Sequence, residues 1–182
     1  MAPVPRAIVA RLTLGALMEI SEFSYPTVTV EVGGRADPRA HAIAWEGLER
    51  YFTAPRVLAA DPEGPPMRWL LDPIRLELNS GVSLAYAPRA APEADVTLLP
   101  DVERLNFGHV GPDTQLGWAR GAPRSLFRAR DSGGRCAVER LVRVVDGKLF
   151  AARRLQLFMI TSNPDIAQTD CLFYAVEDGQ EP

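Results

Sequence analysis

The chain has 182 residues, of which 47% are hydrophobic and 24% charged, a composition typical of one globular domain spanning residues 1–182. Its formal net charge of -3 argues against a general nucleic-acid binder. No apolar stretch approaches the roughly 20 residues of a membrane span, and the signature of a signal peptide is absent. Two cysteines are too few for a disulfide framework, so we expect a cytoplasmic protein with no membrane partner.

The first part of the chain predicts two strands and a helix. Apolar and polar residues alternate over residues 8–20 and 25–32, the period of a half-buried strand. A helix near residues 37–53 follows, because Asp37 suits the N-cap and Pro38 the first helical position. Its apolar face is expected to pack against a sheet and consists of His41, Ala44, Trp45, Leu48 and Phe52.

The middle of the chain predicts one hairpin between two proline-rich segments. Gly81 can supply the left-handed residue of a three-residue turn, which would pair residues 74–78 with residues 82–86. The proline-rich segments, residues 53–73 and 87–124, are expected to be extended and mostly loop. Such long irregular segments in a compact domain are usually functional or packed against a partner.

The last third of the chain predicts a meander of antiparallel strands. These strands cover residues 126–130, 135–145, 148–161 and 169–176. The dipeptide Asp146-Gly147 between apolar runs is a strong hairpin signal, because a type I′ turn needs positive φ at both central positions. The register that follows pairs Val144 with Leu149, Val142 with Ala151, Arg140 with Arg153 and Val138 with Leu155.

These patterns favour a mainly β fold of the α+β kind. Both faces of the meander carry apolar residues, so the sheet must be covered on both sides. We therefore predict an antiparallel barrel-like or strongly curved sheet, with the one helix near residues 37–53 packed against it.

The first candidate site is Arg140 with Arg153, placed opposite each other on an otherwise apolar face. Like charges in that position are destabilising, and a buried unpaired guanidinium is costlier still. Three interpretations stay open. Both arginines bind an anionic ligand, or a carboxylate such as Glu77 or Asp170 neutralises them, or a slip in register turns both toward solvent.

A second candidate is the glycine-rich loop over residues 106–118. It carries His109 and Asp113, which could move a proton in catalysis, and Trp118, a candidate for substrate binding. In the alternative, His109 and Asp113 serve the local backbone of tight turns. Glu77 is a further candidate at a pocket, against the alternative that it is simply solvated.

The function suggested by these residues is the binding of a small molecule. With two histidines, no P-loop and no dinucleotide fingerprint, we expect no metal and no cofactor. The first hypothesis is a barrel that binds a small organic anion, as a cofactor-free cyclase, isomerase or dehydratase. The alternative is a non-catalytic assembly or accessory protein whose proline-rich segments contact neighbouring subunits, with self-association into a homo-oligomer.

Overall fold

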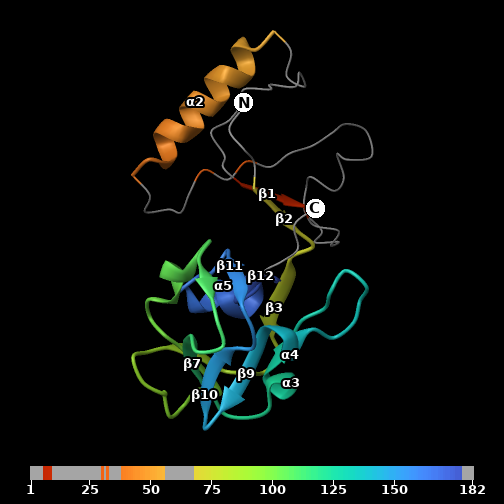
Figure 1. Cartoon of the computed structure of the whole chain (residues 1–182). Coiled ribbons are helices and arrows are strands. Elements are labelled where there is room, and N and C mark those ends of the chain that lie inside the picture. The colour runs from red at the N-terminus through yellow and green to blue at the C-terminus, as the bar shows by residue number, and fades with distance from the viewer. Residues whose placement is uncertain (1–5, 10–29, 31, 33–37, 56–67, 178–182) are drawn as a thin grey trace. The chain divides into compact units, whose positions relative to one another are not determined.

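The computed structural model describes residues 6–9, 30, 32, 38–55 and 68–177 (Figure 1). The chain divides into two compact units. The first comprises Met1–Ile8 and Leu12–Leu70, and the second comprises Val9–Arg11 and Leu71–Pro182. Strands β1 (Arg6–Val9) and β2 (Arg68–Leu71) form a two-stranded sheet.

Helix α2 (Ala40–Thr53) lies within the predicted range, but it begins at Ala40 with Arg39 as N-cap, so the prediction of Asp37 as N-cap and Pro38 as first helical residue is wrong. The expectation that it packs against a sheet is not met, because none of its residues is buried. Trp45 and Phe52, both on its predicted apolar face, are 73% and 78% exposed. The described residues leave this face uncovered.

The second unit contains two five-stranded sheets. The first sheet is mixed, and its order is β4 (Leu84–Tyr86), β5 (Val96–Leu98), β7 (Gln115–Ala119), β10 (Lys148–Ala151) and β9 (Val142–Val145). Its β4 and β5 run parallel, and its other neighbours run antiparallel. The second sheet is antiparallel, and its order is β6 (His109–Val110), β11 (Leu155–Phe158), β12 (Phe173–Glu177), β3 (Ile74–Leu78) and β8 (Phe127–Arg128).

Short helical segments connect these strands. They are the 3-10 helix η1 (Val102–Leu105) and the helices α3 (Pro123–Leu126), α4 (Val138–Leu141) and α5 (Pro164–Thr169). Helix α5 begins at Pro164, between the predicted strands over residues 148–161 and 169–176. The side chain of Asn163 caps this helix by accepting the backbone N–H of Asp165 at 3.0 Å, and Pro164 suits its first turn.

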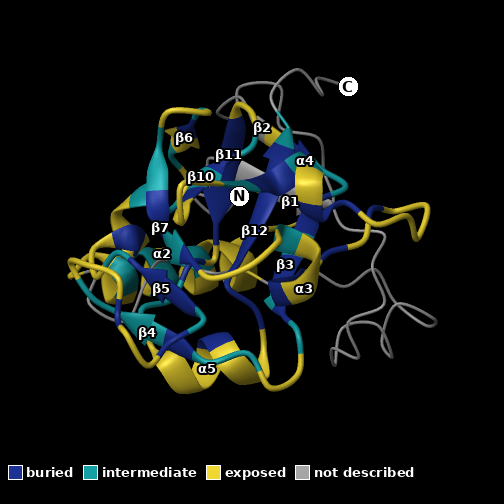
Figure 2. Cartoon of the chain, turned by 90° about the horizontal axis from the view of Figure 1, so that it is seen from below, coloured by how far each residue is buried: buried dark blue, intermediate teal, exposed yellow. Residues whose placement is uncertain are grey.

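The hydrophobic core draws on both sheets. Alternation in β3 buries Ile74, Leu76 and Leu78, while Leu149 and Ala151 of β10 come from the other sheet and join the same cluster. Figure 2 shows buried residues on the strands of this unit and exposed ones on the loops and on α5.

The predicted barrel is wrong, because neither sheet closes on itself or curls strongly. The physical reason is that the chain crosses between sheets where the sequence suggested hairpins. Gly81 does take positive φ, +82°, in a turn closed by Val82 N–H to Asn79 O. However, β3 before this turn and β4 after it belong to different sheets, so the predicted 74–86 hairpin does not form.

The Asp146-Gly147 hairpin is confirmed over its first four pairs. Asp146 and Gly147 have φ of +51° and +74°, and the register places Leu149 opposite Val144 and Ala151 opposite Val142. Beyond these pairs the prediction fails. The segment before β9 is the helix α4, and the chain bends after β10 to enter the second sheet as β11.

Residues 87–124 are mostly loop, as expected, although they also supply the strands β5, β6 and β7. Their strands are short, which hides the alternation from a sequence pattern. The strands predicted over residues 8–20 and 25–32 lie largely outside the described residues.

Candidate functional site

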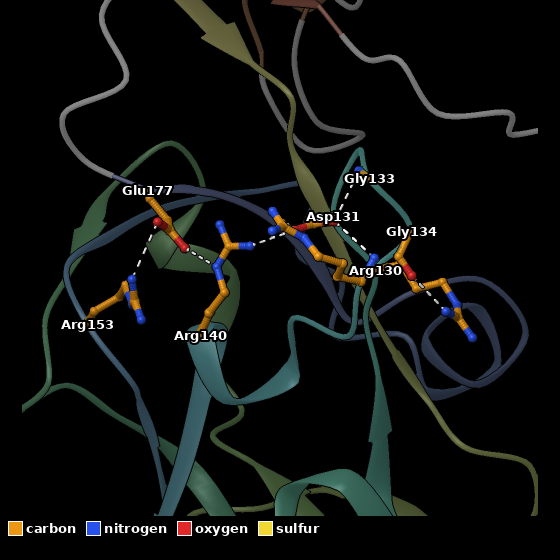
Figure 3. A network of polar contacts seen from close by, with 8 residues as sticks. Arg130, Asp131, Gly133, Gly134, Arg140, Arg153 and Glu177 are labelled. Carbon is orange, nitrogen blue, oxygen red and sulfur yellow. Dashed lines mark hydrogen bonds and ion pairs between the residues drawn. The ribbon is translucent and has the colours of Figure 1, made fainter.

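Arg140 and Arg153 both reach the carboxylate of Glu177, at the end of β12 (Figure 3). The Arg140 Nε donates to Oε1 of Glu177 at 2.8 Å, and the Arg153 Nη1 lies 3.5 Å from Oε2. Helix α4 carries Arg140, and the bend after β10 carries Arg153. A carboxylate of the chain therefore compensates the two arginines, and it is Glu177 rather than Glu77 or Asp170.

Asp131 provides a second carboxylate and is only 9% exposed. Its Oδ2 accepts from Arg140 Nη1 at 3.0 Å and from Arg135 Nε at 3.1 Å, while its Oδ1 accepts the backbone N–H groups of Gly133 and Arg135. Such an Asp side chain, bonding the backbone that follows it, is typical of tight turns. The hydrogen bond from the Arg135 backbone holds the pKa of Asp131 below its usual range.

A small cavity of about 120 Å³ lies beside this network. Three carboxylates, Asp72, Asp131 and Glu177, line it together with the guanidiniums of Arg135 and Arg140. Because carboxylates outnumber guanidiniums in this lining, the cavity does not attract an anion. An anion that reached Arg140 would also have to displace a carboxylate that already bonds to it. The network joins the turn after β8, helix α4 and the end of β12, so its geometry is that of a structural clamp. Substrate binding here stays a prediction that this geometry does not favour.

The predicted acid and base, His109 and Asp113, both lie exposed. His109 belongs to β6, opposite Gln156 of β11. Asp113 belongs to the turn between β6 and β7, which Thr114 N–H closes by donating to Gly111 O at 2.8 Å. Neither residue lines the cavity beside the arginines. Their role in proton transfer stays a prediction.

The remaining candidates, Glu77 and Trp118, are separate from the arginine network. Glu77 of β3 forms ion pairs with Arg75, at 3.0 Å, and with Arg128 of β8, so it is engaged rather than simply solvated. Trp118 of β7 is half-buried and lines a second cavity, which shares no residue with the one beside Arg140. The structure thus does not gather the predicted site residues into one pocket.

Two residues that matter most here, Asp131 and Glu177, were not predicted as partners of the arginines. Asp131 opens an Asp-Ser-Gly-Gly turn that the sequence does signal, but nothing in that pattern points to Arg140. Glu177 ends the last strand, and only the order of strands in the sheet brings it near α4. No local spacing would have found this pair.

The described part of the chain contains no group of three or more His, Cys, Asp or Glu residues placed to hold a metal ion. None of its helices is long and apolar enough to cross a bilayer.

Comparison with known proteins gives no family. No protein-family model, no curated protein and no solved structure matches this chain.

Proposed function

We propose that this protein is a non-catalytic assembly protein that associates with further copies of itself through α2. The observation that carries the proposal is a row of large apolar side chains on this helix, here called the α2 face. Its members Trp45, Leu48, Tyr51 and Phe52 are 73%, 54%, 56% and 78% exposed.

The α2 face follows helical spacing. Trp45, Leu48 and Phe52 stand at i, i+3 and i+7, so they lie along one side of the helix. Glu46 and Arg50, which form an i,i+4 ion pair, fall on the opposite side. Water-facing aromatic side chains in a contiguous row are rare on monomers and typical of interaction surfaces.

The area is sufficient for an interface between two copies. Aromatic side chains bury about 150–250 Å² each, so at these exposures the α2 face offers about 500 Å² per copy. Two such faces together bury about 1,000 Å², the lower bound of a stable interface. No member of the α2 face is charged, and Glu49, one turn from both Trp45 and Phe52, lies at its edge.

The proline-rich segments contribute less to this proposal than α2 does. Residues 87–124 supply β5, β6 and β7 to the sheets of the second unit, so they are not free arms. The arginine network is compensated within the chain, which removes the main support for an anionic substrate.

The test is sedimentation velocity of the full chain between about 1 and 100 µM. We expect a concentration-dependent mass above the monomer for the wild type, and a monomer for the double variant Trp45→Gln/Phe52→Gln. The matched control is Val145→Gln, which removes an exposed apolar side chain from β9 and should leave assembly unchanged. A wild type that is monomeric at 100 µM, or a double variant that still assembles, would refute the proposal. Circular dichroism verifies that each variant keeps its secondary structure.

A further inference from the structure

A cavity in the second unit lies apart from the arginine network and shares no lining residue with the cavity there. It has a volume of about 250 Å³ and is lined by residues of the loop after β4, of β5, of β7 and of the Asp146-Gly147 turn. Here we propose that this cavity binds a small uncharged ring compound carrying a hydrogen-bond acceptor. The inference is independent of assembly through α2.

The cavity lies on the face of the first sheet that points away from the core. Thr97 of β5 and Trp118 of β7 are cross-strand partners, so their side chains share this face. Their neighbours Val96 and Leu98 point the other way, into the core cluster. The loop after β4 covers this face, because the backbone N–H of Ala91 donates to Thr97 Oγ1 at 3.0 Å.

Small side chains explain why the space stays open. Ala91 and Ala94 line the cavity and are themselves buried, and neither side chain reaches far enough to fill it. Trp118 adds the one large apolar surface. An apolar cavity of about 150 Å³ already accepts benzene, so this larger one has room for a ring with a polar substituent.

Thr97 supplies the polar contact that a ligand would need. It is 2% exposed, and its oxygen accepts the Ala91 N–H. Its hydroxyl proton has no acceptor among the hydrogen bonds of the described residues. A buried donor without a partner is costly, so an acceptor atom on a ligand in the cavity would be favoured.

The charges around the cavity disfavour an anion, and its mostly apolar lining makes the burial of any charged group costly. Asp95 and Asp146 line it, against a single guanidinium, Arg120. Arg120 is already engaged, because it donates to Pro92 O of the covering loop. Two carboxylates and one occupied guanidinium give an anion no advantage.

The experiment is a titration of the full-length ¹⁵N-labelled protein with benzamide, followed by amide and indole chemical shifts. We expect saturable shifts at Thr97, Trp118 and Ala119, with a Kd of about millimolar for a probe of this size. Benzoate, which has the same ring and a charge, should bind at least tenfold more weakly. Absence of saturation with benzamide, or equal binding of benzoate, would overturn the proposal.

Substitutions of residues that line the cavity distinguish binding of the probe inside the cavity from binding elsewhere on the surface. Ala90 lines the cavity but is exposed, so Ala90→Phe should fill the space without disturbing the core and abolish the shifts. Thr97→Ser keeps the donor and should keep binding within about twofold, whereas Thr97→Val should weaken it about fivefold or more. Unchanged benzamide shifts in Ala90→Phe would place the probe elsewhere and refute this site.

Discussion

The Nε–H group of Arg140 donates a hydrogen bond of 2.8 Å to Glu177 Oε1, and this bond connects α4 to the end of β12. The same guanidinium also donates to Asp131, so one side chain bridges two carboxylates from distant parts of the chain. The hydrogen bond to Glu177 raises the pKa of Arg140, so the guanidinium at the centre of the bridge stays charged.

We expect Arg140→Met to destabilise the fold by about 1–2 kcal/mol, because a charge-assisted hydrogen bond is lost and two carboxylates lose a partner. The loss of stability should not exceed this range, because the Arg140 side chain is 32% exposed and water screens its charge. Urea unfolding of Arg140→Met, Glu177→Gln and the double variant would give the coupling between them. Arg104→Met is the control, because Arg104 belongs to an exposed pair at 3.9 Å and should change little. An Arg140→Met protein as stable as the wild type would contradict the clamp.

Acid should weaken the wild type partly through Asp131. Its pKa is lowered in the folded state, so the stability that it contributes is fully present above its unfolded pKa of about 3.9. That contribution is lost as pH falls through the folded pKa. Asp131→Asn removes this titration, so the variant should be less stable than the wild type at pH 6, with the difference shrinking toward pH 3. Urea midpoints measured at several pH values between 6 and 3 check this, and a constant difference would speak against it.

Gly117 of β7 should tolerate no side chain. A Cβ at this position would meet the backbone oxygen of Thr97 at 1.9 Å, so β5 and β7 would have to separate. We expect Gly117→Ala to lower stability by about 3 kcal/mol or more, or to prevent folding. Gly111→Ala is the matched control, because a Cβ there meets nothing within 4 Å. Thermal unfolding of the two variants distinguishes them, and equal melting temperatures would contradict this packing.

The two thiols should differ in reactivity. Burial raises the pKa of Cys171 to about 11, whereas Cys136 is exposed. A disulfide reagent at pH 8 should therefore modify one thiol rapidly and the second only after unfolding. Cys136→Ser should abolish the rapid phase. A rapid phase that persists in Cys136→Ser would show that Cys171 is accessible.

Local signals in the sequence predicted local structure well. The Asp146-Gly147 turn has the expected positive φ at both positions, because two adjacent residues with these preferences determine the turn by themselves. Helix α2 ends at the expected residue, Thr53, because helical spacing acts within a few residues, whereas its start at Ala40 differs from the expected start at Pro38.

Pairing between distant segments was not predictable in this way. The turn at Gly81 forms, yet the strands on either side of it belong to different sheets. A turn residue permits a change of direction but does not decide which neighbour the next strand finds. The compensation of Arg140 by Glu177 depends on that choice of neighbour, so the sequence left it as one of three interpretations.

The place of β12 in the second sheet has a consequence for how the protein is made. β12 lies between β11 and β3, and it aligns Phe173 with Leu76, almost a hundred positions earlier. During synthesis β3 emerges almost a hundred residues before β12 and has no neighbour on this side of the sheet until β12 follows. Strands that lie so far apart in the sequence pair slowly, and their apolar surface stays exposed to solvent until they pair. A nascent chain stopped before residue 173 therefore lacks the central strand of this sheet and leaves the sheet incomplete.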